Sequence, residues 1–383
     1  MKIVFVSNFL NHHQLPICKA FNSMPCIEFS FVNTTPVPNE RLGMGYHDMN
    51  HAFDFVTCTY DGIDSHKKAL DLCKKADVVI IGSAPKEYII QRLKTKKLTF
   101  KYSERIYKTK PPFYQMPLRA VKYFWDNGRH KNLYLLCASA YTAADYAKTH
   151  TFINKTYKWG YFPEVKKYED IENIIQKKQK CSLLWVGRLI DWKHPEAAVQ
   201  VALRLKQAGY KFFLNIIGTG TMENELKSLI SSYDLNDCVH MLGSMPPERV
   251  REYMEQSEIF LFTSDRQEGW GAVLNESMNS GCVVVASSAI GSVPFLIKDG
   301  KNGLIYRDGD IDDMYEKVKY LIDDKEKVAD LGKNAYMTLS DLWNAETAAE
   351  RFIKLVEMIQ SGNIYELFED GPCSKAAVLK DDW

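Results

Sequence analysis

Two glutamates, Glu268 and Glu276, lie on either side of a glycine-flanked turn at the start of a helical pattern. Gly269 and Gly271 let the backbone come close to a ligand, and Ala272 to Asn279 reads as a short helix. At about 1.5 Å per residue, Gly271 and Glu276 are separated by about 7.5 Å along such a helix. One carboxylate can therefore serve each end of an elongated ligand, while the start of the helix between them faces an anion.

A sugar nucleotide has the chemistry that this pattern fits. Glu276 would bind ribose hydroxyls, Glu268 would bind hydroxyls of the sugar, and the diphosphate would lie at the helix start. The apolar run Cys282 to Ala286 follows and predicts a buried parallel strand. Two glutamates alone are more often a loop residue and a helix residue that favours the dipole. The glycines, Trp270 and the strand favour the ligand site over that simpler interpretation.

The segment Glu268-Gly-Trp-Gly-Ala-Val-Leu-Asn-Glu276 resembles the paired-glutamate motif of the retaining glycosyltransferases of family 4. This family has the GT-B architecture, in which two Rossmann-like α/β domains face each other across a cleft. The resemblance is specific from Leu183 to Glu350 and is one of fold in the N-terminal half. Asn275 stands where the family usually has Leu, a change of packing more than of chemistry. The resemblance implies that the nucleotide is contacted by Gly269, Trp270, Gly271, Ala272 and Glu276.

Two cations are expected at the diphosphate. The segment Gly187-Arg188-Leu-Ile-Asp-Trp-Lys193 follows a predicted strand and precedes a helix with Pro195 in its first turn. Arg188 and Lys193 match the family's Arg and Lys that hold the donor diphosphate. Cations suit that position because the leaving nucleotide gains negative charge as the glycosidic bond breaks. The resemblance implies that they act in catalysis together with Glu268.

Further contacts to the nucleotide are expected from the next two strands. The strand Phe212 to Ile217 ends in Gly218-Thr-Gly220, which predicts a close approach of the backbone to the nucleotide. By resemblance, Met241 in the segment His240 to Gly243 lies against the base. Uridine is the commonest base in the family, and the sugar and acceptor stay open.

The N-terminal half offers candidates for the cleft and the acceptor. Asn11, His12 and His13 follow the first predicted strand, and ligands of doubly wound folds bind outside the carboxyl ends of strands. This loop lacks the glycine pair that family 4 often has there. Glu104 and Arg105 close a later apolar run and are expected to face the same cleft. No metal is predicted at the His pair, because adjacent histidines diverge and a third ligand is not evident.

The length of 383 residues exceeds the size at which one hydrophobic core keeps growing, so two domains are expected. Apolar runs alternate with helical patterns, which predicts parallel α/β sheets. We place an acceptor-side Rossmann-like domain at 1–165 and a nucleotide-sugar-binding domain at 180–343, joined by a charged linker. The architecture implies that a terminal helix at about 344–383 packs back on the first domain.

The composition is that of a soluble globular protein, with 46% hydrophobic and 25% charged residues. No apolar run approaches the about 18 residues of a membrane span, and the N-terminus lacks a signal-peptide pattern. Nine scattered cysteines without a Cys-x-x-Cys pair indicate reduced thiols and a cytoplasmic protein.

Positive charge is concentrated between Arg92 and Lys131. This stretch contains twelve Lys or Arg residues and only two acidic residues, with aromatic residues interleaved among them. We expect this stretch to meet the anionic inner face of a membrane, where a lipid-linked acceptor resides. Each base near such a surface contributes about 1 kcal/mol. A solvated basic face and a nucleic-acid patch are the alternatives, and no nucleic-acid partner is predicted.

Together these features predict a retaining glycosyltransferase that needs no metal or other cofactor. It would move a sugar from a nucleoside-diphosphate sugar, with UDP-sugar as the first expectation, to a glycan or lipid-linked saccharide, as in bacterial polysaccharide or glycoconjugate synthesis. The alternatives are a nucleotide-sugar epimerase of the same architecture and a catalytically silent nucleotide-binding module. The segment Asp308-Gly-Asp310 imitates a metal-binding Asp-x-Asp signature. We expect Asp310 to cap the next helix instead, with Asp312 and Asp313 in its first turn.

Overall fold

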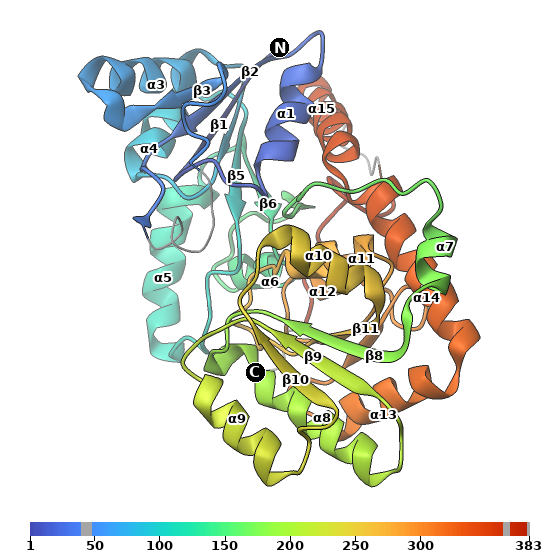
Figure 1. Cartoon of the computed structure of the whole chain (residues 1–383). Coiled ribbons are helices and arrows are strands. Elements are labelled where there is room, and N and C mark those ends of the chain that lie inside the picture. The colour runs from blue at the N-terminus through green and yellow to red at the C-terminus, as the bar shows by residue number, and fades with distance from the viewer. Residues whose placement is uncertain (40–47, 363–367, 381–383) are drawn as a thin grey trace. The chain divides into compact units, whose positions relative to one another are not determined.

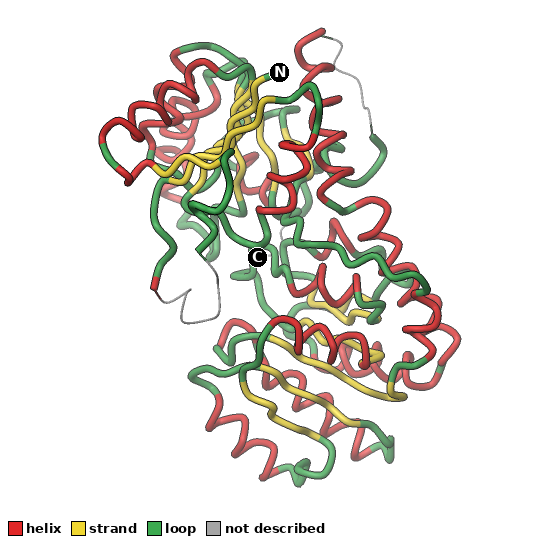
Figure 2. The backbone as a smooth tube through the Cα atoms, turned by 45° about the horizontal axis from the view of Figure 1, so that its top comes forward, coloured by secondary structure: helices red, strands yellow, loops and turns green. Residues whose placement is uncertain are grey.

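The computed structural model describes residues 1–39, 48–362 and 368–380. It divides the chain into two compact units, Met1–Glu164 with Asn344–Trp383, and Val165–Trp343. Each unit contains one sheet of parallel strands (Figure 1). In each unit, helices lie on both sides of the sheet (Figure 2). Within the described ranges, no helix combines the length and the apolar character needed to cross a bilayer.

The first unit is built on seven parallel strands in the order β3-β2-β1-β4-β5-β6-β7. Its strands are β1 (Lys2–Ser7), β2 (Glu28–Asn33), β3 (Val56–Cys58), β4 (Val78–Ile81), β5 (Thr99–Ser103), β6 (Leu133–Cys137) and β7 (Thr156–Lys158). Its helices are α1 (Leu15–Ser23), α3 (Ile63–Lys75), α4 (Lys86–Lys94), α5 (Met116–Tyr123), α6 (Thr142–Ala147) and α15 (Ala345–Ser361). The chain winds outward from β1 to β3 and returns to the other side at β4, so the sheet is doubly wound.

The second unit has six parallel strands in the order β10-β9-β8-β11-β12-β13. Its strands are β8 (Gln179–Val186), β9 (Phe213–Ile217), β10 (Val239–Gly243), β11 (Ser257–Phe262), β12 (Val283–Ser287) and β13 (Leu304–Tyr306). Its helices are α7 (Ile171–Gln176), α8 (Pro195–Gln207), α9 (Glu223–Ser232), α10 (Pro247–Gln256), α11 (Val273–Asn279), α12 (Val293–Leu296), α13 (Ile311–Asp323) and α14 (Lys325–Met337). The winding again reverses beside the first strand of the unit.

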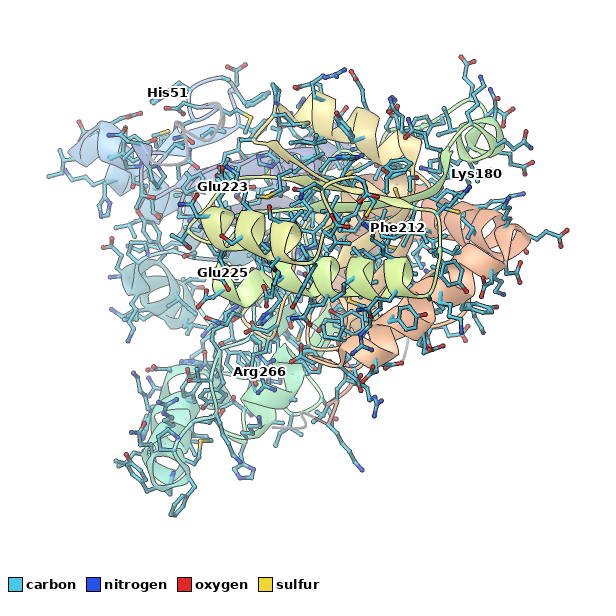
Figure 3. The ribbon with its side chains drawn as sticks, turned by 60° about the horizontal axis from the view of Figure 1, so that its bottom comes forward. His51, Lys180, Phe212, Glu223, Glu225 and Arg266 are labelled. Carbon is cyan, nitrogen blue, oxygen red and sulfur yellow. The ribbon has the colours of Figure 1, made fainter. Side chains whose placement is uncertain are left out.

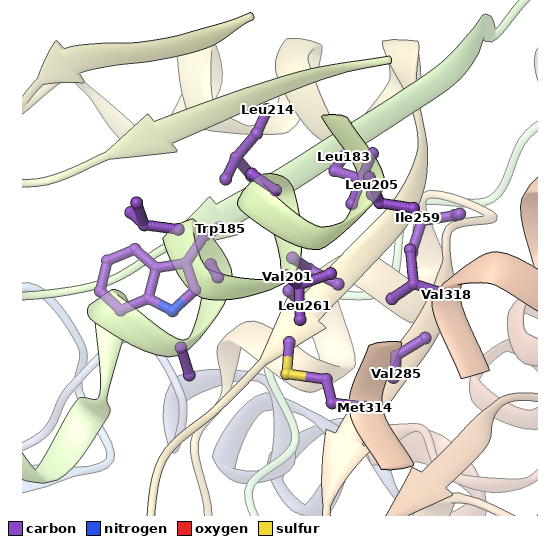
Figure 4. Close-up of a cluster of buried hydrophobic side chains, with 14 of the residues drawn as sticks. Leu183, Trp185, Val201, Leu205, Leu214, Ile259, Leu261, Val285, Met314 and Val318 are labelled. Carbon is purple, nitrogen blue, oxygen red and sulfur yellow. The ribbon is translucent and has the colours of Figure 1, made fainter. Parts of the chain in front are cut away.

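The second unit's core follows from apolar strands covered by amphipathic helices. Helix α8 starts with Pro195, which has no amide hydrogen to lose at that position. Its predicted apolar face is fully buried, including Val201 and Leu205. Figure 4 shows these two side chains in one cluster with Leu183 of β8 and Leu214 of β9. This packing fixes the end of β8 from which the next loop starts.

The C-terminal segment packs within the first unit. Helix α15 lies against α1, and its Phe352 ring contacts those of Phe21, Phe100 and Trp159, with centroids 5.5, 4.9 and 5.7 Å away. Farther on, Tyr157 of β7 forms an antiparallel bridge with Lys375, and the Cys373 amide donates to the Lys158 carbonyl over 2.8 Å. The tail after α15, to which the sequence assigned no role, therefore covers an edge strand that would otherwise be open to pairing.

Several expected elements differ in extent. The apolar run Phe53 to Cys58 predicts a strand, of which the structure forms only β3. The prolines, glycines and Asn of residues 34–51 predict a long loop, and its residues 40–47 lie outside the described residues. The charged stretch 164–180, expected as a linker, contains α7 and packs in the second unit. Lys178 attaches this stretch to the second unit, since its buried ammonium donates to the carbonyls of Met254 and Ser257 over 2.7 and 2.9 Å.

The basic stretch between residues 92 and 131, which was predicted to meet an anionic membrane, is partly internal. Arg92 is 0% exposed, and its guanidinium donates to four backbone carbonyls and to Thr99 Oγ1. Burial lowers the pKa of Arg92 to about 10 and that of Lys101 to about 8. These bases hold the framework of the first unit together and add no charge to its surface.

Candidate active site

The second unit has a topological switch point between β8 and β11, where the winding reverses (Figure 1). Ligands of doubly wound sheets bind in the crevice outside the carboxyl ends of the strands at such a point. The loop 187–194 follows β8, and the loop 263–272 follows β11. The structure therefore places Arg188 and Lys193 on one loop of this crevice and Glu268 on the other.

An ion pair joins the two loops. Lys193 Nζ lies 2.5 Å from Glu268 Oε2, and Ser264 Oγ donates to the same oxygen over 3.2 Å. The two side chains stay partly accessible, with 14% of Lys193 and 12% of Glu268 exposed. Lys193 can donate to phosphate oxygens, and Glu268 can accept from hydroxyl groups. The pair thus offers both kinds of contact that a sugar diphosphate needs.

Hydrogen bonds hold the two loops next to each other. Thr263 Oγ1 donates to the Lys193 carbonyl over 2.7 Å and accepts from Trp185 Nε1 over 2.8 Å. The Asp265 amide donates to the Trp192 carbonyl over 3.0 Å. Since Trp185 is itself a core residue, the position of Lys193 is tied to the packed interior. Groups fixed in this way lose little freedom when a ligand binds.

Arg188 and Lys193 flank one aromatic ring. Arg188 Cζ lies 5.9 Å and Lys193 Nζ lies 4.8 Å from the centroid of the Trp192 ring, within the range of cation–π attraction. Arg188 is exposed at the rim, whereas Lys193 is half-buried. Sequence reasoning named the two bases and missed Trp192, whose ring both bases approach, and Ser264, which donates to Glu268. The place of Trp192, between the two bases in sequence, was the available signal.

The glycines after β9 pack against the loop after β8. Gly218 has φ +139°, and a Cβ there would lie 1.8 Å from the Gly187 carbonyl oxygen. At Gly220 a Cβ would lie 2.3 Å from the Leu189 carbonyl oxygen. The close approach predicted at these glycines is thus made to protein backbone next to Arg188. Helix α9 carries Glu223 and Glu225 in its first turn (Figure 3), so its own acids already offset its dipole.

Gly271 and Trp270 shape the turn before α11. Gly271 has φ +75°, and a Cβ there would lie 2.4 Å from Phe262 and 3.1 Å from Glu268 Cγ, so only glycine fits beside the glutamate. Gly269 is buried in the same turn. Trp270 is 1% exposed and donates through Nε1 to Asn275 Oδ1 over 2.9 Å. Trp270 therefore packs in the core of the second unit with Asn275 as its hydrogen-bond acceptor, and its contact with the nucleotide stays a prediction.

The remaining nucleotide-side candidates lie on α11 and β10. Ala272 caps α11 and is 8% exposed. Glu276 is in the first turn of α11, where burial raises the pKa of its carboxyl and Arg251 lowers it in part. Met241 on β10 packs against the core of the second unit. At the start of α11 the Leu274 amide donates to the Gly271 carbonyl over 3.0 Å and the Glu276 amide to the Ala272 carbonyl over 3.2 Å.

In the first unit, a chain of contacts connects four of the polar candidates. Asn11 Oδ1 accepts from the His13 amide over 3.0 Å and so orders the turn before α1. The rings of His12 and His13 lie 3.8 Å apart, so the expected divergence of the two histidines is wrong. The His13 ring stacks on Tyr161 at 5.7 Å, and Tyr161 OH donates to Glu104 Oε1 over 2.5 Å. Tyr161, which the sequence reading passed over, links the loop after β1 to the loop after β5.

Arg105 does not belong with these candidates. Its side chain is 1% exposed and forms an ion pair with the buried Asp145, with Nη2 3.3 Å from Oδ1. The same carboxylate accepts from the amides of Ile106 and Tyr107. In this structure the charge of Arg105 balances that of Asp145 inside the first unit, and a contact of Arg105 with a ligand stays a prediction.

The carboxylates of the Asp-x-Asp segment have partners within the second unit. Asp310 Oδ1 accepts from the Asp313 amide over 2.9 Å, so its predicted role as the cap of α13 is confirmed. Asp308 Oδ1 accepts from Ser287 Oγ over 2.9 Å, and Asp312 pairs with Arg204. These contacts explain the cluster as the start of α13.

One group of three potential metal ligands occurs within the described ranges, in the first unit. The ligand atoms of His51, Cys58 and Asp61 lie within 4.8 Å of one another. They already bond to protein: His51 Nε2 lies 3.1 Å from Asp61 Oδ2, and Cys58 Sγ donates to the Asn50 carbonyl over 3.4 Å. Sequence reasoning did not find this group, because its members have no familiar spacing.

Most of the second unit resembles a known protein family in sequence. Residues 167–338 match the family model of the glycosyl transferases group 1. The amylovoran biosynthesis glycosyltransferase AmsK of Erwinia amylovora is 36% identical over 137 residues, which are 34% of this chain and 33% of that protein. A Campylobacter jejuni N-acetylgalactosamine-N,N'-diacetylbacillosaminyl-diphospho-undecaprenol 4-alpha-N-acetylgalactosaminyltransferase is 31% identical over 193 residues, 49% of this chain and 48% of that protein.

The likeness in fold extends over both units. The crystal structure of Anabaena Alr3699/HepE in complex with UDP superposes with a TM-score of 0.65 at 15% identity, covering 94% of this chain and 100% of that one. With two doubly wound parallel sheets in the chain, this likeness confirms the predicted GT-B fold class. The sequence matches are shorter, and the chain spans from about a third to about half of the length of these curated relatives.

Proposed function

Because residues 167–338 match the family model of the glycosyl transferases group 1, we propose that the chain transfers a sugar from a nucleoside diphosphate with retention of configuration. The observation that carries this proposal is the Lys193–Glu268 pair, with its 2.5 Å contact, at the switch point of the second unit. A cation beside a hydroxyl-binding carboxylate, both positioned by the sheet, is the arrangement that a sugar diphosphate requires.

The donor that we propose is a UDP-sugar. The Anabaena protein of the same fold is named as a complex with UDP, and uridine is the commonest base in the resembling family. We assign the diphosphate to Arg188, Lys193 and the amides that follow Gly271, the sugar hydroxyls to Glu268, and the ribose to Glu276. Gly218 and Gly220 would shape the floor of this site through their contact with the loop after β8.

The proposed reaction needs no side-chain nucleophile. The bond from the sugar's anomeric carbon to the diphosphate oxygen breaks, and the acceptor oxygen bonds to that carbon on the same face. The acceptor's proton passes to the departing phosphate oxygen, whose charge Arg188 and Lys193 stabilise. Because both cations sit on a loop fixed by the core, they are in place before charge develops. Preorganised cations of this kind act mainly in the transition state.

For the acceptor we propose a glycan or a lipid-linked saccharide, used in the synthesis of a polysaccharide or glycoconjugate. The names of the two curated relatives, an amylovoran biosynthesis enzyme and a transferase acting on a diphospho-undecaprenol, support this class of acceptor. His13, Tyr161 and Glu104 in the first unit form the connected polar surface best suited to bind its hydroxyls. A lipid-linked acceptor would keep the enzyme at the inner face of the membrane.

The proposal is tested by incubating the full-length chain with single UDP-sugars and short glycan acceptors, with products read by mass spectrometry and proton NMR. We expect a product heavier than the acceptor by one sugar residue, with the anomeric configuration of the donor. A product with inverted configuration would contradict the retaining mechanism. Conversion of the donor to an isomeric nucleotide sugar without any acceptor would contradict transfer itself.

We predict that transfer is unaffected by removal of divalent metal. The charge of the leaving diphosphate is matched by Arg188 and Lys193, and the aspartates of the Asp-x-Asp segment are engaged in capping α13 and in contacts within the second unit. The rate should be the same in excess EDTA and with added Mg²⁺ or Mn²⁺. Loss of activity in EDTA that either ion restores would show that a metal holds the diphosphate.

A further inference from the structure

Helix α5 carries apolar side chains on its surface and none in the core. None of its residues is buried, although a surface helix usually turns its apolar stripe toward the core. Residues 113–125 expose Phe113 (86%), Tyr114 (67%), Leu118 (77%), Val121 (59%), Phe124 (51%) and Trp125 (56%). These six side chains, here called the α5 face, form a concentration of exposed apolar groups that marks an interaction site.

The α5 face lies along one continuous stretch of helical backbone. A 3₁₀ turn, η2 (Phe113–Gln115), leads into α5, and a π-helical turn, η3 (Phe124–Gly128), follows it. Tyr114, Leu118, Val121 and Trp125 recur at intervals of four, three and four residues, which places them on one side of a helix. The apolar residues are therefore aligned as a ridge.

The other side of the segment is anchored in the first unit. Asn127 is 3% exposed and accepts from Lys101 Nζ over 3.2 Å. The ring of Tyr123 packs edge-on against the buried Tyr146 at 5.7 Å. A helix held from behind presents its outer side chains without having to fold first, which reduces the entropy lost on binding.

Basic side chains border the α5 face. Between residues 110 and 131 the chain has Lys110, Arg119, Lys122, Arg129 and Lys131 against a single acid, Asp126. All of these bases are exposed except Arg119, which is half-buried and lies over the ring of the buried Tyr107. Arg129 stacks on Trp125, with Cζ 4.9 Å from the ring centroid. A surface with an apolar ridge and flanking bases matches a layer that is apolar within and anionic outside. This is the composition of helices that lie in the interface of a membrane.

We infer that the α5 face inserts its six apolar side chains into the headgroup–acyl boundary of an anionic lipid bilayer. The aromatic rings suit that depth because they have an apolar body with polar edges. The bases contribute attraction to the anionic surface. This goes beyond a charged surface, since Arg92, Lys101 and Arg105 face inward and the apolar ridge supplies the contact.

A second copy of the chain is the competing occupant of this face. A twofold contact would bring the five bases of one copy against the same five of the other. Like charges at such an interface repel, whereas an anionic headgroup layer neutralises them. Charge complementarity therefore selects the bilayer.

The inference is tested by co-sedimentation of the full-length chain with phosphatidylcholine vesicles, with and without phosphatidylglycerol, in the absence of donor and acceptor. We expect binding to the anionic vesicles, weakened by salt. The double substitution Leu118→Glu and Val121→Glu should lower the partition constant of the protein for the anionic vesicles by about tenfold or more. Two apolar anchors are lost and negative charge is added. Ile63→Glu is the matched control, since Ile63 is 72% exposed on α3 of the same unit, and it should bind as the wild type does.

Insertion is distinguished from surface attachment by quenching of Trp125 fluorescence with lipids brominated on the acyl chain. Trp125 is 56% exposed, whereas Trp159, Trp185, Trp270 and Trp343 are buried and Trp192 is half-buried in the second unit. Quenching should therefore be strong in the wild type and largely lost in Trp125→Phe. Equal vesicle binding by the Leu118/Val121 variant, unquenched Trp125, or self-association that this variant abolishes would overturn the inference. Because no sugar transfer is measured, such a result leaves the proposed function standing.

Discussion

Replacement of Glu268 by alanine is expected to lower turnover by about 10²–10³, the scale for loss of one preorganised polar group at a reacting centre. Glu268 is the acceptor for Lys193 and Ser264 in the free protein and is proposed to hold the sugar hydroxyls. Without it, Lys193 loses its partner and the sugar loses its anchor. Turnover at saturating donor measures the effect, and Arg188→Ala should reduce turnover on the same scale through the diphosphate.

The matched control for Glu268→Ala is a buried carboxylate of the same unit that lies at the other end of the same strand. Glu258, at the start of β11, is 8% exposed in its side chain, pairs with Lys180 at 3.0 Å and accepts from the Cys181 amide. Glu258→Gln should reduce the free energy of unfolding while turnover per folded molecule stays at the wild-type value. Wild-type turnover in a folded Glu268→Ala variant would remove Glu268 from the site.

Replacement of Gly218 by alanine is expected to have the second large effect, on both stability and donor binding. The new Cβ would lie 1.8 Å from the Gly187 carbonyl oxygen, so the loop after β8 or the loop after β9 must move. Overpacking of this kind destabilises by about 1–3 kcal/mol, in addition to about 1–3 kcal/mol for the unfavourable φ of +139°. Because Arg188 follows Gly187, the KM for the donor should rise as well.

Gly62 provides the control that separates the two causes. It has the same φ of +139°, but a Cβ there meets nothing within 4 Å. Gly62→Ala should therefore show the cost of backbone strain alone, with an unchanged KM for the donor. Both free energies of unfolding can be compared by urea denaturation. Equal losses in the two variants would mean that the contact with Gly187 is not what requires glycine at position 218.

Much of the second unit could be predicted because its sequence is locally consistent. Pro195 and Gly209 bracket α8, its apolar positions are buried as the helical spacing predicts, and Asp310 caps α13. The structure of the first unit was harder to predict from its sequence. Arg92 and Arg105 look like surface charges in sequence, yet they are held inside by carbonyls and by Asp145. Local pattern carries no information about partners that are distant in the chain.

The candidate site shows the same division. Residue type and position after a strand were enough to select Lys193 and Glu268, and the fold brings them into contact. The signal did not reveal that Trp270, inside the ligand motif, is buried with Asn275 as its hydrogen-bond acceptor. It also failed at Tyr161, because the contact with Glu104 joins residues far apart in the chain. Such pairings follow from the strand order of the sheet, which sequence spacing does not contain.

The central claim, that the donor's diphosphate binds between the loops after β8 and β11, is tested most directly by calorimetric titration. The best-binding nucleoside diphosphate of a UDP, GDP and ADP panel, and its sugar-bearing form, would be titrated into the wild type, Lys193→Ala and Glu268→Ala. Lys193→Ala should weaken both ligands by about tenfold or more, since a hydrogen bond to a charged group contributes about 1.5–3 kcal/mol. Glu268→Ala should weaken chiefly the sugar-bearing form. Unchanged affinity of Lys193→Ala for the nucleoside diphosphate would contradict the account.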